Sequence, residues 1–113
     1  MSEVKYSVFI SGPMTGFPLY NFPAFAAAER TLRERGLTVS YNPARDDLQR
    51  FGLSIFDEEW MQKHFSYEEA LARCLDEVGK ADFIALLPGW ELSNGSKREL
   101  CRALELKKGV ILL

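Results

Sequence analysis

The chain is poor in the residue types that crosslink proteins or hold metal ions. Its 113 residues include a single histidine and two cysteines, Cys74 and Cys101. The cysteines form no C-x-x-C pair, and both fall inside helices that the sequence predicts. This pattern supports neither a disulfide framework nor a zinc site. We therefore expect a reducing compartment and a protein that works without a metal or cofactor.

The chain also lacks an excess of positive charge and any long apolar run. Lys and Arg number 14 against 16 Asp and Glu, so no broad electropositive surface is expected, which argues against binding of nucleic acid polymers. No apolar stretch approaches the roughly 18 residues of a membrane span, and the N-terminus MSEVKYSVFISG does not read as a signal peptide. We expect no membrane partner and a cytoplasmic location. Neither observation argues against a small-molecule ligand.

Hydrophobic residues make up 47% of the chain, enough for one core at this length but not for two. We predict a single domain spanning residues 1–113. Short, near-continuous apolar runs separated by amphipathic segments are typical of a parallel sheet covered on both faces. The predicted fold class is α/β, a doubly wound parallel sheet of about four strands with a flavodoxin- or Rossmann-like layout. The predicted strands are 5–10, 37–41, 82–87 and 110–113, and the predicted helices are 21–36, 55–65, 66–79 and 94–108.

Helix ends are indicated by capping residues and glycines. Asn21 is expected to cap the first helix, and the pairs Ser54 with Asp57 and Ser66 with Glu69 resemble capping boxes. Gly109 is expected to end the last helix. Residues 44–54 show no clean period and are interpreted as a loop with at most a turn of helix.

A glycine-rich loop follows the first predicted strand. Its hydroxyls and flexible backbone suit the binding of a phosphate or a sugar. However, SGPMTG is neither a dinucleotide-binding fingerprint nor a P-loop. A purely structural turn explains the loop equally well. The candidate ligand-binding residues here are Ser11, Gly12, Thr15 and Gly16.

The stretch from Leu86 to Glu99, LLPGWELSNGSKRE, follows a buried strand at the edge where open α/β sheets place their ligands. Small polar residues at the start of a helix favour an anion, and Trp90 is a candidate to stack on a base, as are Tyr20 and Trp60. Glu99 is either a catalytic carboxylate or a surface carboxylate paired with Arg102 or Lys97. The candidate anion-binding residues are Ser93, Gly95 and Ser96.

The acidic run 57–59 and His64 belong to the predicted helix 55–65. Three consecutive carboxylates point in different directions on a helix, so we interpret them as a solvated face that suits the helix dipole, and His64 as a cation at the helix end.

Three segments together resemble the nucleoside 2-deoxyribosyltransferase-like superfamily, which includes the 2′-deoxynucleoside 5′-monophosphate N-glycosidases. They are VFISGPMTG with YNFPAFAAAERTLRERG, NPA after the second strand, and ADFIALLPGWELSNGSKRE. The chain is most similar to an uncharacterised, phage-rich branch, and only residues 45–65 are left unmatched.

The resemblance implies that Glu99 is the nucleophile that attacks C1′ of a deoxyribosyl unit. It implies that Ser93, Gly95 and the Ser11-Gly12 loop hold the sugar and its 5′-phosphate. Displacement at an anomeric carbon also needs a second acid. The superfamily places an aspartate eight residues before the third strand's own Asp, and here that position is Cys74, a poor acid that also lies on the apolar stripe of its helix. Asp76 is close in sequence but faces elsewhere on the helix.

Two functions follow from these residues. The first is cleavage of a nucleoside or nucleotide N-glycosidic bond, or deoxyribosyl transfer, with Lys97, Arg98 and Arg102 favouring the ionised form of Glu99. The second is a non-catalytic protein that binds or sequesters a nucleotide. The edges of the predicted sheet would be poorly covered in a monomer, and the resemblance implies an oligomer, as superfamily members typically are. We therefore expect a homodimer or larger assembly.

Overall fold

The computed structural model describes residues 5–14, 16–50, 52, 59, 63 and 66–113. Its centre is a parallel sheet in which all neighbouring strands pair in the same direction, in the order β2-β1-β3-β4. The first strand is therefore internal, and β2 and β4 are the edges. The strands are β1 (Ser7–Ser11), β2 (Thr38–Tyr41), β3 (Phe83–Leu86) and β4 (Gly109–Leu112).

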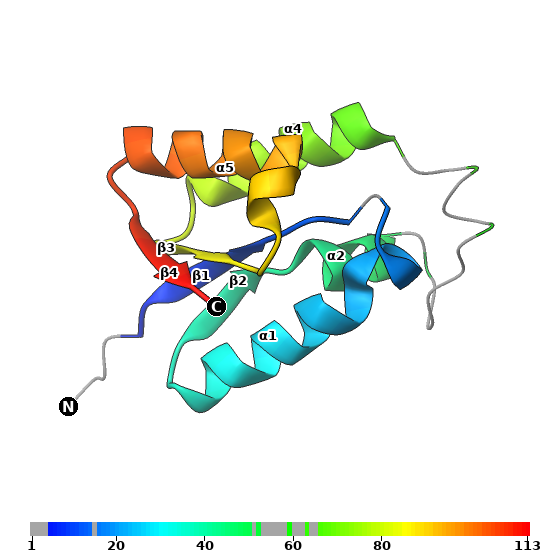
Figure 1. Cartoon of the computed structure of the whole chain (residues 1–113). Coiled ribbons are helices and arrows are strands. Elements are labelled where there is room, and N and C mark those ends of the chain that lie inside the picture. The colour runs from blue at the N-terminus through cyan, green and yellow to red at the C-terminus, as the bar shows by residue number, and fades with distance from the viewer. Residues whose placement is uncertain (1–4, 15, 51, 53–58, 60–62, 64–65) are drawn as a thin grey trace.

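Helices cover both faces of this sheet (Figure 1). The helix pair α1 (Phe22–Glu34) and α2 (Pro43–Arg50) lies on one side, and the pair α4 (Tyr67–Val78) and α5 (Asn94–Glu105) lies on the other. Two short 3-10 turns, η1 (Pro18–Asn21) and η2 (Trp90–Leu92), precede α1 and α5. The predicted α/β, doubly wound fold class is confirmed.

Alternation along β1 explains why both faces need cover. Val8 and Ile10 pack into one core with Leu32 of α1, whereas Phe9 between them packs into the other core with Val78 of α4. All of these side chains are fully or almost fully buried. A strand that contributes to two cores reads as an unbroken apolar run, which is the signal that predicted it.

Helix α2 lies where the sequence predicted a loop. Oδ1 of Asn42 accepts hydrogen bonds from the N–H groups of Ala44 and Arg45 at 3.1 and 3.4 Å, and Pro43 occupies the first helical position. These contacts satisfy N–H groups that a helix start leaves unpaired. The prediction failed because one buried face of Pro43, Ala44 and Asp47 is too short to show a period.

The structure does not test the predicted helix 55–65. The structure describes only Glu59 and Lys63 of it, so the Ser54 and Asp57 capping box, most of the acidic run and His64 lie outside the described residues. The same holds for Thr15 and Trp60.

Of the predicted helix ends at Ser66, Asn21 and Gly109, one is confirmed and two are wrong. The Ser66 hydroxyl accepts a hydrogen bond from the N–H of Glu69 at 3.3 Å, as the capping box predicted. The prediction for Asn21 was wrong: its side chain makes no cap and instead donates to the carbonyl of Pro13 at 2.9 Å. The prediction for Gly109 was also wrong, because α5 ends at Glu105 and Gly109 begins β4. A Cβ at Gly109 would lie 2.3 Å from the ring of Phe83, which explains the glycine there.

The inward face of α5 carries polar residues. Leu104 is 57% exposed, whereas Ser96, Glu99 and Ala103 are buried. The polar part of this face lies toward the start of the helix, next to the carboxyl ends of the strands. Among the described helices, none is long and apolar enough to cross a membrane.

Candidate functional site

A cavity of about 610 Å³ opens at the carboxyl ends of β1 and β3. Its volume lies in the range of small-molecule sites, and its position is the one expected for a ligand of an open parallel sheet. Its walls come from the loop after β1 and from α1, α2, α4 and α5. The polar or ionisable residues that line it are Tyr41, Asp47, Cys74, Ser93, Asn94, Ser96 and Glu99.

Glu99 lines this cavity from the inner side of α5. Its side chain is only 7% exposed, and Oε1 accepts a hydrogen bond from the hydroxyl of Ser11 at 2.5 Å. Arg102, one of the two expected surface partners, instead pairs with Glu105 at 3.3 Å. The interpretation of Glu99 as a surface carboxylate is therefore wrong.

Burial sets the protonation of Glu99. Loss of hydration raises the pKa of its carboxyl group to about 7, and hydrogen bonds from Ser11 and Cys74 offset part of that rise. The expectation that Lys97, Arg98 and Arg102 would favour ionisation was wrong, because none of them is among the causes of the shift. The group therefore titrates near neutral pH, as suits a residue that exchanges charge during a reaction.

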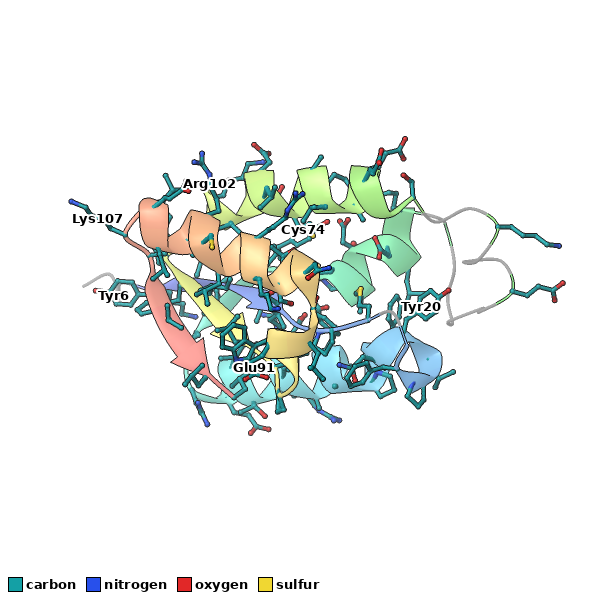
Figure 2. All side chains as sticks on the ribbon, turned by 45° about the horizontal axis from the view of Figure 1, so that its top comes forward. Tyr6, Tyr20, Cys74, Glu91, Arg102 and Lys107 are labelled. Carbon is teal, nitrogen blue, oxygen red and sulfur yellow. The ribbon has the colours of Figure 1, made fainter. Side chains whose placement is uncertain are left out.

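Cys74 is a neighbour of Glu99. It is 7% exposed and belongs to the core cluster of α4 and α5, as its place on the apolar stripe predicted. Figure 2 shows it between these two helices, while Arg102 lies on the outer surface of α5. Burial, followed by the negative charges of Glu99 and Asp47, raises the pKa of the thiol far above its usual value. The thiol is therefore a neutral hydrogen-bond donor and no nucleophile.

The start of α5 supplies unpaired polar groups. The hydroxyl of Ser93 caps the helix by accepting from the N–H of Ser96 at 3.1 Å. The hydroxyl of Ser96 itself is buried, lines the cavity and has no hydrogen-bond partner among the described residues. A buried hydroxyl without a partner is unfavourable unless a ligand or water satisfies it. Together with the helix dipole, it makes this end of the cavity suited to an anion.

Gly12 closes the cavity against the sheet. A Cβ at this position would lie 2.6 Å from Cδ1 of Leu87, and the N–H of Leu87 donates to the carbonyl of Ser11 at 2.9 Å. Only a glycine lets the ends of β1 and β3 approach this closely. The close approach brings Ser11 within reach of Glu99.

Asp47 is the site residue that sequence reasoning missed. It is 3% exposed and lines the same cavity from α2. Burial raises the pKa of its carboxyl group to about 6, and the cation of Arg73 offsets part of the rise. Had the NPA turn been interpreted as a helix start, Asp47 would have fallen on the buried face with Pro43 and Ala44.

The other predicted site residues lie in different places. Ser11 and Gly95 belong to this site, since Gly95 lines the cavity and Ser11 contacts Glu99. Gly16 is exposed and lies outside the cavity lining, and Trp90 packs against the core cluster of α4 and α5. The aromatic residues that do line the cavity are Phe17, Phe25 and Tyr41. A stacking role for Trp90 stays a prediction.

No group of three or more potential metal ligands occurs in the described part of the chain. The cavity instead combines two buried carboxyl groups, a helix start and aromatic walls. This set suits acid, base and nucleophile chemistry on a ligand with an anionic group.

The chain belongs to the family described as "Domain of unknown function (DUF4406)", whose sequence model matches residues 6–112. A search of curated proteins finds no match.

Proposed function

We propose that this member of the DUF4406 family cleaves the N-glycosidic bond of a 2′-deoxynucleoside or its 5′-monophosphate, or transfers the deoxyribosyl unit, with Glu99 as nucleophile. The observation that carries the proposal is the buried Glu99 carboxyl group, held by Ser11 inside a cavity of about 610 Å³. The resemblance to the nucleoside 2-deoxyribosyltransferase-like superfamily supplies the reaction class. No metal or cofactor is required.

The arrangement of groups supports a sugar phosphate as ligand. A 5′-phosphate at the start of α5 would accept a hydrogen bond from the unpaired Ser96 hydroxyl and interact with the helix dipole. Glu99 follows one turn later on the same face of the helix, so a sugar bound through its phosphate would present its ring to this carboxylate. Apolar walls from Phe17 and Phe25 leave room for the base.

The reaction proceeds in two displacements. The ionised carboxylate of Glu99 attacks C1′, the C1′–N bond breaks, and the base leaves with its bonding electron pair and takes up a proton. Water, or the nitrogen of a second base, then attacks C1′, the bond from C1′ to Glu99 breaks and restores the carboxylate, and the attacking group loses a proton. The hydrogen bond from Ser11 to Oε1 holds the carboxylate in place for this attack.

A second function is binding without turnover. Cys74 occupies the position where the resemblance implies a catalytic aspartate, and its thiol stays protonated. A protein with this pocket and no proton donor would hold or sequester a nucleotide.

Base release separates the two functions. The protein is incubated with the four 2′-deoxynucleosides and their 5′-monophosphates, and free base is measured by chromatography. Wild type should release base from at least one of them, and Glu99→Ala should not. Binding measured by thermal shift without base release from wild type would favour the second function.

We further propose a cytoplasmic protein that works as a homodimer or larger assembly. Edge strand β4 exposes Val110 by 42% and Leu112 by 70%, and both are apolar. Apolar side chains on an edge strand favour association with a second copy.

A further inference from the structure

A second buried carboxyl group shares the cavity with Glu99. Asp47 of α2 lines this cavity too, and it is 3% exposed. Within the described part of the chain its carboxylate has one ion pair, with Nη2 of Arg73 at 3.8 Å. That distance is too long for a good hydrogen bond. A buried carboxylate held this weakly is unfavourable for folding, which marks it as a functional group.

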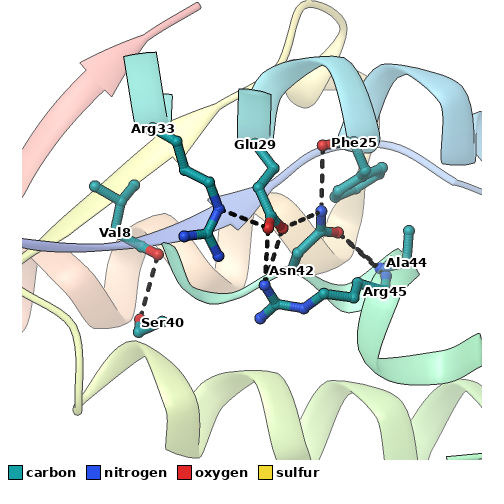
Figure 3. Close-up of polar contacts among 8 residues, drawn as sticks. All are labelled: Val8, Phe25, Glu29, Arg33, Ser40, Asn42, Ala44 and Arg45. Carbon is teal, nitrogen blue, oxygen red and sulfur yellow. Dashed lines mark hydrogen bonds and ion pairs between the residues drawn. The ribbon is translucent and has the colours of Figure 1, made fainter. Parts of the chain in front are cut away.

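The position of Asp47 is fixed by a polar network between α1 and α2 (Figure 3). The side-chain amide of Asn42 donates to the carbonyl of Phe25 at 3.2 Å and to Oε1 of Glu29 at 3.1 Å. Nη1 of Arg45 also binds Glu29, at 2.9 Å to its nearer oxygen. Since Asn42 also caps α2, this network joins the start of α2 to α1 and fixes the direction in which Asp47 points.

Cys74 lies near both carboxyl groups. The charges of Glu99 and Asp47 both raise the pKa of its thiol, and all three residues line the same cavity. Asp47 is thus near the position where the resemblance implies an acid, although it comes from a different helix.

We propose that Asp47 donates a proton to the departing base and so replaces the carboxyl group missing at Cys74; this inference rests on the function proposed above. The nitrogen of an N-glycosidic bond shares its lone pair with the base, so the proton is taken up by another heteroatom of the ring. That atom lies beyond C1′ as seen from the nucleophile.

In the first step the Glu99 carboxylate forms a bond to C1′, the C1′–N bond breaks, and the proton of Asp47 moves to the base. In the second step the Asp47 carboxylate takes a proton from water, the water oxygen bonds to C1′, and Glu99 leaves as a carboxylate. The enzyme then regains its starting protonation.

The charged groups around Asp47 set the pH dependence. Apart from burial, its pKa responds to the cation of Arg73 on α4 and to Asp46 and Arg50 on α2. Activity should require ionised Glu99 and protonated Asp47. The pH profile of kcat/KM should therefore be a bell with its maximum between the two pKa values of about 6 and about 7. Because the group that must be ionised has the higher pKa, the active form is a minor one, the acidic limb follows Asp47 and the alkaline limb follows Glu99.

The test compares two leaving groups on the best substrate of the base-release assay. The first is the natural base, and the second is 4-nitrophenolate on the same 2-deoxyribose, which leaves without a proton. Asp47→Asn should lower kcat/KM for base release by roughly 10² to 10⁴ while changing kcat/KM for release of nitrophenolate by less than about tenfold, because kcat/KM reports the departure of the leaving group and not the later attack of water. Asp76→Asn is the matched control, since that carboxylate is 73% exposed and pairs with Lys80. It should change neither rate.

Two results would overturn the inference while leaving the proposed function intact. They are base release by Asp47→Asn at the wild-type rate, or an equal loss with both leaving groups. If wild type releases neither group, the proposed function fails and the role of Asp47 fails with it.

A second variant keeps the test decisive should Asp47→Asn not fold. Arg73→Gln removes the cation that lowers the pKa of Asp47, so the acidic limb of the bell, which follows the lower of the two pKa values, should move to higher pH. An acidic limb that does not move would contradict a proton-donating Asp47.

Discussion

The hydroxyl of Ser11 donates a hydrogen bond of 2.5 Å to Oε1 of Glu99, across 88 residues of sequence. It connects the end of β1 to the inner face of α5 at the edge of the sheet where the cavity opens. Both side chains are buried, at 1% and 7% exposure, so this bond is formed away from solvent. A hydrogen bond to the ionised form lowers the pKa of a buried carboxyl group, and here it opposes the effect of burial.

Ser11→Ala should therefore raise the pKa of Glu99 further above about 7. Base release by the variant should peak at a higher pH, because the alkaline limb of its pH profile, which follows the higher of the two pKa values, should move upward from that of wild type. Ser40→Ala is the matched control, because the Ser40 hydroxyl on β2 donates to the carbonyl of Val8 at 3.2 Å and lies outside the cavity lining. Identical profiles for wild type and Ser11→Ala would contradict the assignment.

Stability should depend on pH through Glu99. Its pKa rises from 4.5 to about 7 on folding, so the folded state holds a proton that the unfolded state has lost between these values. This contribution is fully present below the unfolded pKa and is lost as pH rises through the folded one, by roughly 3 kcal/mol in total. Glu99→Gln lacks this titration. Its free energy of unfolding should therefore rise relative to that of wild type as pH increases over the same range.

Urea unfolding of wild type and Glu99→Gln at a series of pH values measures this difference. Glu105→Gln changes an exposed carboxylate paired with Arg102, and its free energy of unfolding should depend on pH in the same way as that of wild type. A constant difference between wild type and Glu99→Gln would mean that Glu99 ionises freely in the folded protein.

The two cysteines should differ in reactivity. Cys101 is exposed, whereas Cys74 is buried and its pKa is raised by burial and by Glu99. A bulky thiol reagent should label Cys101 rapidly and Cys74 only as the protein opens. Cys74→Ser should lower the free energy of unfolding by roughly 1 to 3 kcal/mol, and Cys101→Ser by much less. Rapid labelling of Cys74 in the folded protein would contradict its place in the core.

Oligomerisation should depend on the edge strand β4. We expect sedimentation at micromolar concentration to show a species of at least twice 12.9 kDa. Leu112→Lys should shift this species toward the monomer, because it places a charge on a side chain that is 70% exposed. Glu105→Lys changes an exposed residue outside that strand and serves as control. A wild-type monomer at this concentration would reject the assembly.

Patterns of apolar residues that continue along a whole strand or helix predicted most of the fold. The apolar runs of β1 and β3 and the stripe of Leu71, Cys74 and Val78 on α4 depend on burial that repeats along one element, so they are visible in sequence. The contact between Ser11 and Glu99 is different, because only the close approach at Gly12 creates it. The raised pKa of Glu99 likewise follows from burial, which neighbouring charges in the sequence did not reveal.

Asp47 was missed for a related reason. A helix of eight residues with one inward carboxylate gives no period to detect, and the Asn42 network that orients it joins residues from three segments. Sequence reasoning found the catalytic candidate that a family pattern marks. It did not find the one that this chain supplies from α2.

The most direct test of the central claim is base release by Glu99→Gln. The substitution keeps the size of the side chain and its hydrogen bond from Ser11 but removes the nucleophile. Wild type and variant are assayed on the best 2′-deoxynucleoside or 5′-monophosphate of the panel, and affinity is measured by calorimetry on the same preparations. We expect Glu99→Gln to release no base while its affinity stays within about tenfold of wild type. Base release by Glu99→Gln at the wild-type rate would show that the nucleophile lies elsewhere.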